Sequence, residues 1–469
     1  MKKHLITLLL IASVHTLMAQ SIAGNWYGNL KVQGQALPIV FHITQTGNTY
    51  TTKWDSPSQG ANNLDTKATT LKNNIIQIDA SQYGIVYTGN FLPDSNKING
   101  TFSQGGLSMP LVLTPNKQEA AAQKSDRRPQ DPSSFPYKQE EVTFINPKGG
   151  NKLAGTLTLP ANGKASKIVV LISGSGAQNR NEELMNHRPF LVWSDWLTRQ
   201  GIAVLRYDDR GVNQSTGNFQ TATTADFADD AEAAVNFIKS REDLKALQVG
   251  LIGHSEGGMV APMVASRNKQ VNFLVLLAAP GVPIDQLLIK QSADLLHARG
   301  VKDSIINLDK GVKQTIYKAV KQYNNLPAAT FKGKLDTITV TYLRKIDPQP
   351  VSDSIAYKVA RKQYTDELAT PWYRYFITFN PAQYLTQVKC PVLALNGTLD
   401  LQVDAGANLP GIKTSLQKAG NKKFETVPLP GLNHLFQKAT TGDVSEYAKI
   451  EETVNPAALQ KVSSWINGL

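Results

Sequence analysis

One serine lies in a sequence context that favours nucleophilic chemistry. Ser255 is the centre of Gly253-His-Ser-Glu-Gly257, which follows the apolar run Val249–Ile252 and precedes small, apolar residues suited to a packed helix. A strand, a tight turn and a helix in this order form a nucleophile elbow, which lifts the serine hydroxyl out of the sheet. The two glycines let the backbones of the turn pass one another. The Glu256 amide of such a turn points to the place where an oxyanion would form.

A serine hydroxyl becomes a good nucleophile only when a neighbouring base takes its proton. In proteins built on this elbow, the acid and then the histidine follow the serine, each after a later strand. Two histidines follow Ser255. His297 falls within a helical pattern, whereas His434 lies in Pro430-Gly-Leu-Asn-His-Leu435, a loop after the last expected strand. We therefore predict His434 as the base, and we expect the His254 side chain to point elsewhere.

The acid should follow the strand that precedes the histidine loop. Val392–Leu395 is an apolar run that leads into Asn396-Gly-Thr-Leu-Asp400, so Asp400 is the predicted acid. Its role is to hold the imidazole in the right tautomer and to stabilise its cation. Asp404, four residues later, and Asp285, after an earlier strand, remain alternatives.

A second oxyanion donor is expected from the loop Ser173-Gly-Ser-Gly-Ala-Gln178, which follows the apolar strand Lys167–Ile172. Its glycines allow the backbone to approach a substrate closely. We predict the Ser175 amide as this donor, with Gly176 as the next choice; one such donor can be worth about 3 kcal/mol of transition-state stabilisation. The loop lacks the ending and spacing of phosphate-binding motifs, which argues against a nucleotide site.

Composition narrows the classes of protein further. The chain has 469 residues, of which 41% are hydrophobic and 18% charged, enough for two or three domains with a sizeable core. A single cysteine, Cys390, allows no internal disulfide and no thiolate metal cluster, and we expect neither metal nor organic cofactor. The net charge of +12 falls to +10 without Lys2 and Lys3. The basic residues are scattered, which argues against a nucleic-acid partner.

The N-terminus has the features of a secretion signal. Lys2 and Lys3 precede an apolar run from Leu5 to Val14, which is too short to span a bilayer. We predict a signal peptide over residues 1–19, with cleavage near Ala19. The mature protein is then exported to the periplasm or the exterior, without stable membrane insertion.

Residues 20–115 are expected to form a small all-β domain. Leu37, Ile39, Phe41 and Ile43 alternate with other residues, as in a half-buried strand. Gly24-Asn-Trp-Tyr-Gly28 is similar to the opening of lipocalin-like barrels. Either the domain binds a ligand or polymer, or it is a packed accessory that covers or orients an enzyme. Residues 116–134 lack an apolar period and are predicted to be a linker.

Residues 135–469 alternate between strand and helix patterns, which predicts a mainly parallel sheet with helices on both faces. Thr224–Lys239 is an amphipathic pattern with Thr224 as its expected cap. Asp208-Asp-Arg-Gly211 is expected to pin loops through ion pairs. Helical patterns over about 281–381 interrupt the alternation and predict a cap. Its aromatic stretch Thr370–Phe379 either walls a pocket or packs between elements.

Residues from about 137 onward resemble bacterial esterases of the α/β-hydrolase superfamily that carry an extra β-rich domain. The stretches that carry the resemblance are SGSGAQNRNEE, LRYDDRGVNQSTGNF, GLIGHSEGG, PVLALNGTLDLQV and LPGLNHLFQ. It implies an α/β-hydrolase fold with a helical cap, behind an accessory β domain. It also implies a serine carboxylesterase that cleaves short-chain acyl esters with Ser255, Asp400 and His434 as triad.

Two other hypotheses stay open. A serine peptidase could use the same triad, although no paired carboxylates placed to grip a substrate amino terminus are evident. A non-enzymatic polymer-binding protein could carry its function in the β domain. The expected partner under the first hypothesis is a small ester, and the sequence leaves the oligomeric state open.

Overall fold

The computed structural model describes residues 21–469 except 33–34, 48, 57–60, 105–106, 118–127 and 347–361. The chain divides into two compact units, with the boundary between Lys124 and Ser125. The expected signal peptide and most of the expected linker lie outside the described residues. We describe each unit by itself.

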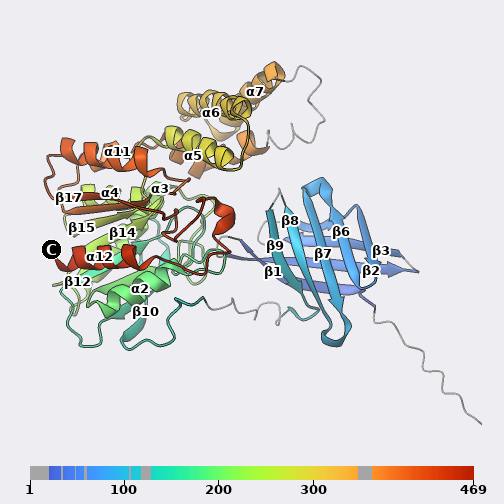
Figure 1. Cartoon of the computed structure of the whole chain (residues 1–469), viewed down its shortest axis with the longest axis horizontal. Coiled ribbons are helices and arrows are strands. Elements are labelled where there is room, and N and C mark those ends of the chain that lie inside the picture. Colours follow the sequence, from blue (N-terminus) through green and yellow to red (C-terminus); the bar gives the residue numbers. More distant parts are fainter. Residues whose placement is uncertain are drawn as a thin grey trace, which may run out of the picture. The chain divides into compact units, whose positions relative to one another are not determined.

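The first unit is all-β, as expected. Its described residues form a nine-stranded sheet in which Tyr27 and Thr114 exchange two backbone hydrogen bonds of 2.8 and 2.9 Å, so the sheet nearly closes (Figure 1). Large side chains fill its core, among them Phe41, Tyr87 and Phe102. The strands are β1 (Gly24–Val32), β2 (Gln35–Thr46), β3 (Thr49–Ser56), β4 (Ala61–Asp65), β5 (Ala68–Lys72), β6 (Ile75–Ala80), β7 (Ile85–Leu92), β8 (Lys97–Gln104) and β9 (Leu107–Leu113).

The second unit is built on an eight-stranded sheet in its described residues, with the order β10-β11-β13-β12-β14-β15-β16-β17. β11 pairs antiparallel with both β10 and β13, and β13, β12, β14, β15, β16 and β17 run parallel to one another. The carboxyl ends of the parallel strands therefore share one edge. The strands are β10 (Lys138–Ile145), β11 (Lys152–Leu159), β12 (Lys167–Ile172), β13 (Ala203–Tyr207), β14 (Gln248–His254), β15 (Val271–Leu277), β16 (Val392–Gly397) and β17 (Phe424–Leu429).

Helices cover both faces of this sheet (Figure 1). Alternate side chains of β12 enter two different cores, because successive residues of a strand point to opposite faces. Val170 packs with α3 (Thr224–Ser240), α4 (Gly257–Arg267) and α11 (Ala405–Lys418). Val169 packs with α2 (Pro189–Arg199) and α12 (Pro456–Asn467). The predicted doubly covered sheet is confirmed.

The cap of α3 differs by one residue from the prediction. Thr223, not Thr224, is the N-cap, and it forms a capping box with Asp226 at the third helical position. The Thr224 hydroxyl instead donates to the Glu256 carboxylate at 2.6 Å. The expected cap was wrong because this threonine is committed to a tertiary contact, and its neighbour can satisfy the first turn equally well.

The segment between β15 and β16 is helical wherever it is regular in the described residues. Val312, Ile316 and Val320 lie on one side of its longest helix and form an apolar core with Phe331 and Leu335. The helices are α5 (Ile284–Ala298), α6 (Asp303–Tyr323), α7 (Ala328–Ile346), a π-helix (Lys362–Glu367), α9 (Pro371–Thr378) and α10 (Ala382–Leu385). These helices form the predicted cap insertion.

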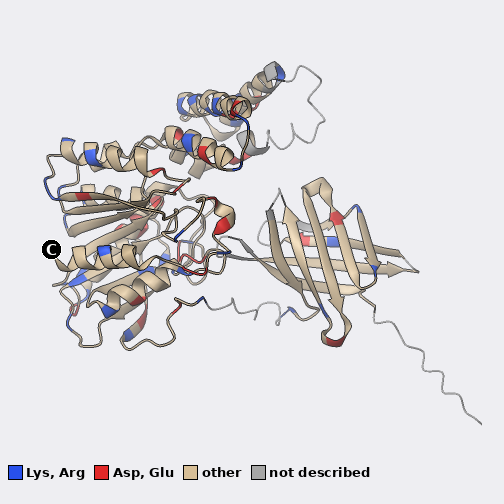
Figure 2. Cartoon of the chain, viewed as in Figure 1, with Lys and Arg blue, Asp and Glu red and all other residues tan. Residues whose placement is uncertain are grey.

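Charged residues of both signs are interspersed on the cap helices α5 and α6 (Figure 2). Across the described part of the chain, every helix is too short or too polar to cross a lipid bilayer.

Candidate active site

Ser255 stands on a strained turn between β14 and α4. Its φ is +53°, in the left-handed region that residues with a side chain rarely adopt. A Cβ on Gly253 would lie 2.0 Å from the Gly257 carbonyl oxygen, and one on Gly257 would lie 2.1 Å from that of Ile172. Neither position tolerates a side chain, so the geometry accounts for both glycines of the motif.

His434 and Asp400 meet at the same edge of the sheet. The His434 Nδ1 lies 2.8 Å from Asp400 Oδ2, and both side chains are buried. Asp400 Oδ1 accepts the amides of Gln402 and Val403, each at 2.8 Å. The carboxylate is thus held rigidly, with one oxygen for its own loop and the other for the imidazole.

The alternative acids and the alternative histidine lie elsewhere. Asp404 caps α11 by accepting the Ala407 amide at 2.8 Å. Asp285 pairs with Lys321, whose Nζ lies 2.6 Å away. His297 is exposed in the last turn of α5. The pairing with His434 therefore favours Asp400 among the three candidate acids.

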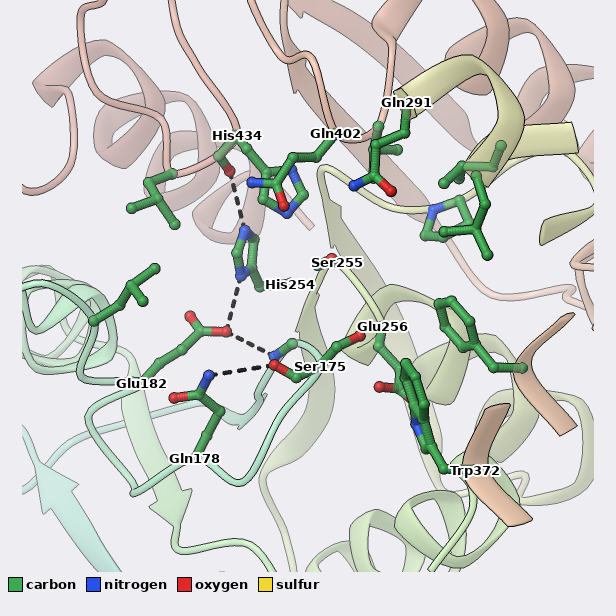
Figure 3. Close-up of a pocket in the computed structure, with 18 of the residues that line it drawn as sticks. Ser175, Gln178, Glu182, His254, Ser255, Glu256, Gln291, Trp372, Gln402 and His434 are labelled. Atoms are coloured by element: carbon green, nitrogen blue, oxygen red, sulfur yellow. Dashed lines mark hydrogen bonds and ion pairs between the residues drawn. The ribbon is translucent and has the colours of Figure 1, made fainter. Parts of the chain in front are cut away.

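Ser255 and His434 line one cavity of about 260 Å³ (Figure 3). Trp372, Tyr373 and Phe376 of α9 form an aromatic part of its wall, and Trp372 also stacks on Phe376. The aromatic stretch therefore serves both readings, since it walls the cavity and packs within the cap. Among the described residues the Ser255 hydroxyl makes no hydrogen bond, including none to His434.

Two backbone amides of the cavity are candidates for oxyanion donors. The Gly174 amide is committed, since it donates to Glu182 Oε1 at 2.7 Å. In the part of the chain that the structure describes, neither the Ser175 amide nor the Glu256 amide donates a hydrogen bond. Both residues line the cavity beside Ser255. Both amides are thus available as donors, and their role in an oxyanion hole stays a prediction from the sequence.

The Glu256 side chain is occupied by structural contacts. Its Oε1 accepts the Thr224 hydroxyl at 2.6 Å and the Trp372 indole N–H at 2.9 Å. Burial raises the pKa of the Glu256 carboxyl, and these hydrogen bonds partly oppose the shift. The carboxylate therefore ties the elbow to α3 and to the aromatic helix of the cap.

A second histidine lies in the cavity wall, against expectation. The His254 Nδ1 lies 2.8 Å from Glu182 Oε1, and the Nε2 lies 3.0 Å from the His434 carbonyl oxygen. The imidazole rings of His254 and His434 have centroids 4.9 Å apart. The prediction that His254 points elsewhere was wrong, because Glu182, 72 residues earlier in the chain, holds its ring at the site. No local sequence signal links these two residues. We call Glu182, His254, Ser255, Asp400 and His434 the cavity cluster.

A second cluster of polar side chains lies around the turn after β13. Arg180 Nη2 lies 2.7 Å from Asp208 Oδ2, and Arg210 Nε lies 2.6 Å from Asp230 Oδ2. Asp209 accepts the Ser173 hydroxyl and the Gln178 amide at 2.8 and 2.9 Å, and burial raises the pKa of this carboxyl well above its ordinary value. The expected pinning role of this turn is confirmed. We call Arg180, Asp208, Asp209, Arg210 and Asp230 the turn cluster.

The cysteine and the possible metal ligands of the chain give no sign of a second reactive site in the described residues. Burial raises the pKa of the Cys390 thiol to about 11, as expected for a structural cysteine. Within the described residues, no group of three or more His, Cys, Asp and Glu side chains is arranged to hold a metal ion.

Sequence comparisons link part of this unit to known proteins. The family described as serine aminopeptidase, S33, matches residues 187–340, a stretch that includes Ser255 and ends before Asp400. Esterase EstD of Thermotoga maritima is 29% identical over 183 residues, which are 38% of this chain and 42% of that protein. The uncharacterized protein YfhR of Escherichia coli is 28% identical over 123 residues, 26% of this chain and 40% of that protein. The chain thus spans about two fifths of the length of these curated relatives.

Solved structures show weaker likenesses. The esterase Pf2001 of Pyrococcus furiosus is 16% identical, with a TM-score of 0.42 over 74% of this chain and 97% of that one. The hypothetical protein PA2218 of Pseudomonas aeruginosa is 17% identical, with a TM-score of 0.44 over 74% and 98%. The sheet order, the serine elbow and the helical insertion give the second unit an α/β-hydrolase fold with a helical cap, and the β-rich unit precedes it in the chain.

Proposed function

We propose that the chain is a serine carboxylesterase that cleaves short-chain acyl esters of small molecules through an acyl-enzyme. One observation carries the proposal: a serine on a strained turn and a histidine held by a buried carboxylate line the same cavity. The curated relative EstD is named an esterase, which agrees with this reaction.

In the proposed reaction, His434 Nε2 takes the proton of the Ser255 hydroxyl as its oxygen attacks the acyl carbon. The amides of Ser175 and Glu256 receive the oxyanion. His434 then gives its proton to the leaving alcohol, which departs and leaves the acyl group on Ser255. In the second half of the reaction, His434 takes a proton from water as the water attacks the acyl-enzyme, and it returns that proton to Ser255 Oγ as the carboxylic acid leaves. Asp400 keeps the proton of the imidazole on Nδ1.

The absence of a hydrogen bond between Ser255 and His434 in the described residues is compatible with this mechanism. Catalytic hydrogen bonds are often long in a ligand-free enzyme and shorten when substrate binds. The small cavity and its aromatic wall favour a compact acyl group over a long chain.

Replacing the nucleophile tests the proposal directly. In Ser255→Ala, hydrolysis of p-nitrophenyl butyrate should fall on the order of 10⁶-fold, with a residual rate that comes from the oxyanion donors and substrate binding. The folded state should persist, because Ser255 Oγ makes no hydrogen bond within the described chain. Covalent labelling of wild-type Ser255 by an organophosphate, read by mass spectrometry, gives a second measurement. Retention of wild-type turnover by Ser255→Ala would refute the mechanism.

A serine peptidase is the second candidate, because the matching family is described as serine aminopeptidase. Recognition of a substrate amino terminus needs a carboxylate that is free to pair with it. The two glutamates that line the cavity, Glu182 and Glu256, each hold two hydrogen-bond donors of the protein already. This arrangement favours ester hydrolysis over the cleavage of peptides at their amino terminus. Faster cleavage of aminoacyl-p-nitroanilides than of p-nitrophenyl butyrate would favour the peptidase.

The remaining proposals concern the β-rich unit and the destination of the protein. We propose that the β-rich unit is an accessory domain, since bulky side chains occupy its core. Binding of a polysaccharide or a lipid by residues 20–115 alone would instead support the polymer-binding alternative. We also propose export after cleavage near Ala19, which N-terminal sequencing of the mature protein tests.

A further inference from the structure

The cavity wall contains a buried charged pair that the proposed reaction does not use. Glu182 lies in the loop after β12 with a φ of +50°, and His254 is the last residue of β14. The side chains are 6% and 9% exposed, and their hydrogen bond is 2.8 Å long. Neither belongs to the predicted triad or to the predicted oxyanion donors.

The contacts of His254 favour its charged form. Both of its ring nitrogens face acceptors, since Nδ1 faces a carboxylate oxygen and Nε2 faces a backbone carbonyl oxygen. A neutral imidazole has only one N–H, so two acceptors require the imidazolium. Burial lowers the pKa of His254, but the charge and hydrogen bond of Glu182 and the His434 carbonyl outweigh it and raise the pKa overall.

The pair joins three segments of the chain. Glu182 Oε1 accepts the Gly174 amide at 2.7 Å in addition to His254 Nδ1. His254 Nε2 donates to the main chain of His434 at 3.0 Å. The glycine-rich loop, the serine elbow and the histidine loop are therefore fastened to one another (Figure 3). A buried ion pair is weak evidence of stabilisation, since apolar side chains of similar volume often serve as well.

We propose that Glu182 and His254 are positioning residues, which hold the glycine-rich loop and the His434 main chain in register with Ser255. The proposal rests on the esterase function given above. Glu182 holds the Gly174 amide in a hydrogen bond, so the neighbouring Ser175 amide is the one that the loop offers to the cavity. The pair also sets the height of the His434 ring relative to the Ser255 hydroxyl.

Variants of the pair test this role by turnover. Glu182→Ala and His254→Asn should each lower kcat about 100-fold with KM changed less than about threefold, the effect expected when reacting groups move by about 1 Å. Glu182→Gln keeps an acceptor oxygen, so its kcat should be at least about tenfold higher than that of Glu182→Ala. The kcat of the double variant Glu182→Ala/His254→Asn should be no lower than that of the less active single variant, since both residues act through one pair.

His187→Asn is the matched control. His187 is also buried and its Nε2 also lies 2.9 Å from a backbone carbonyl oxygen, that of Tyr447, but its Nδ1 meets the Thr453 hydroxyl rather than a carboxylate. It lies outside the residues that line the cavity. His187→Asn should lower thermal stability and leave kcat within about threefold of wild type.

Hydrogen–deuterium exchange provides a readout that needs no substrate. Residues 173–178 and 431–436 should exchange faster in Glu182→Ala and His254→Asn than in wild type and in His187→Asn. Gln437 is left out of this readout because its Nε2 lies 3.2 Å from His187 Nε2. If Glu182→Ala does not fold, Glu182→Gln and His254→Asn carry the same comparison. Unchanged exchange in both loops, or equal loss of kcat in His187→Asn, would overturn the positioning role. If the wild type hydrolyses no ester but both loops still exchange faster in Glu182→Ala and His254→Asn, the esterase proposal would be refuted and the positioning role would stand.

Discussion

The cavity cluster and the turn cluster are both groups of mostly buried polar residues in the second unit, but they differ in which groups they leave without a hydrogen-bond partner. In the turn cluster each charged side chain has a partner, such as Arg180 with Asp208 and Arg210 with Asp230. In the cavity cluster the chain of contacts runs from Asp400 to His434 and stops before the Ser255 hydroxyl, which faces a cavity.

The difference indicates how to tell reactive from structural polar groups. Charges that satisfy one another hold loops in place and leave nothing for a ligand to complete. A held imidazole beside a hydroxyl without a partner leaves one position for a substrate to fill. Substitutions in the cavity cluster should therefore affect turnover, and substitutions in the turn cluster should affect stability.

Among the substitutions that compare the two clusters, Asp400→Asn should have the largest effect. The amide keeps the shape of the carboxylate but no longer holds His434 in the tautomer with its proton on Nδ1, so kcat should fall about 10⁴-fold. The assay is hydrolysis of p-nitrophenyl butyrate by protein shown to be folded by circular dichroism. A loss of less than tenfold would remove Asp400 from the proposed mechanism.

Asp230→Ala should have the next largest effect, on stability rather than turnover. It leaves Arg210 buried without its closest carboxylate, which should lower the free energy of unfolding by about 3–5 kcal/mol. Denaturant titration measures this loss. Turnover per folded molecule should stay within about threefold of wild type. A selective loss of turnover at unchanged stability would contradict the division between the clusters.

Trp372→Phe should have a smaller effect on stability, because it removes one hydrogen bond and keeps most of the stacking on Phe376. Loss of a bond to the buried Glu256 carboxylate should cost about 1.5–3 kcal/mol. Thermal unfolding measures it. Tyr373→Phe, on the same helix, is the control and should leave the Glu256 contacts unchanged; equal destabilisation by both changes would contradict this account.

The smallest effect is a pH dependence that separates two buried histidines. The folded pKa of His254 is raised, so its stabilising contribution is full below the ordinary value of 6.5 and is lost as pH rises through the folded pKa. Burial lowers the folded pKa of His187, so its contribution is full above 6.5 and is lost as pH falls through the folded pKa.

The melting temperatures of wild type, His254→Asn and His187→Asn across pH check this contrast. The difference in melting temperature between wild type and His254→Asn should narrow as pH rises. The difference in melting temperature between wild type and His187→Asn should narrow as pH falls. The corresponding free energy of unfolding can change by at most about 1.4 kcal/mol per pH unit for a single proton. Parallel curves for the two variants would contradict the assigned charge states.

Much of the fold was predictable because its signals are local. Strand and helix patterns predicted the alternation of the second unit. The predicted strand Lys167–Ile172 agrees with the structure, and the amphipathic pattern Thr224–Lys239 agrees with α3 to within one residue. The elbow around Ser255 was predictable because glycine spacing reflects backbone clashes within a few residues. The cap of α3 was displaced to Thr223 by a tertiary contact that no local pattern contains.

By itself, the sequence determined the strained turn of Ser255, the order of the strands that follow it and the loops on which Asp400 and His434 lie. Only the tertiary structure decided that Asp400 rather than Asp404 or Asp285 reaches the imidazole, and that Glu182 holds His254 at the cavity. The physical reason is range. Backbone sterics and hydrophobic period act over a few residues, whereas the pairing of buried polar side chains depends on which strand ends the folded sheet brings together.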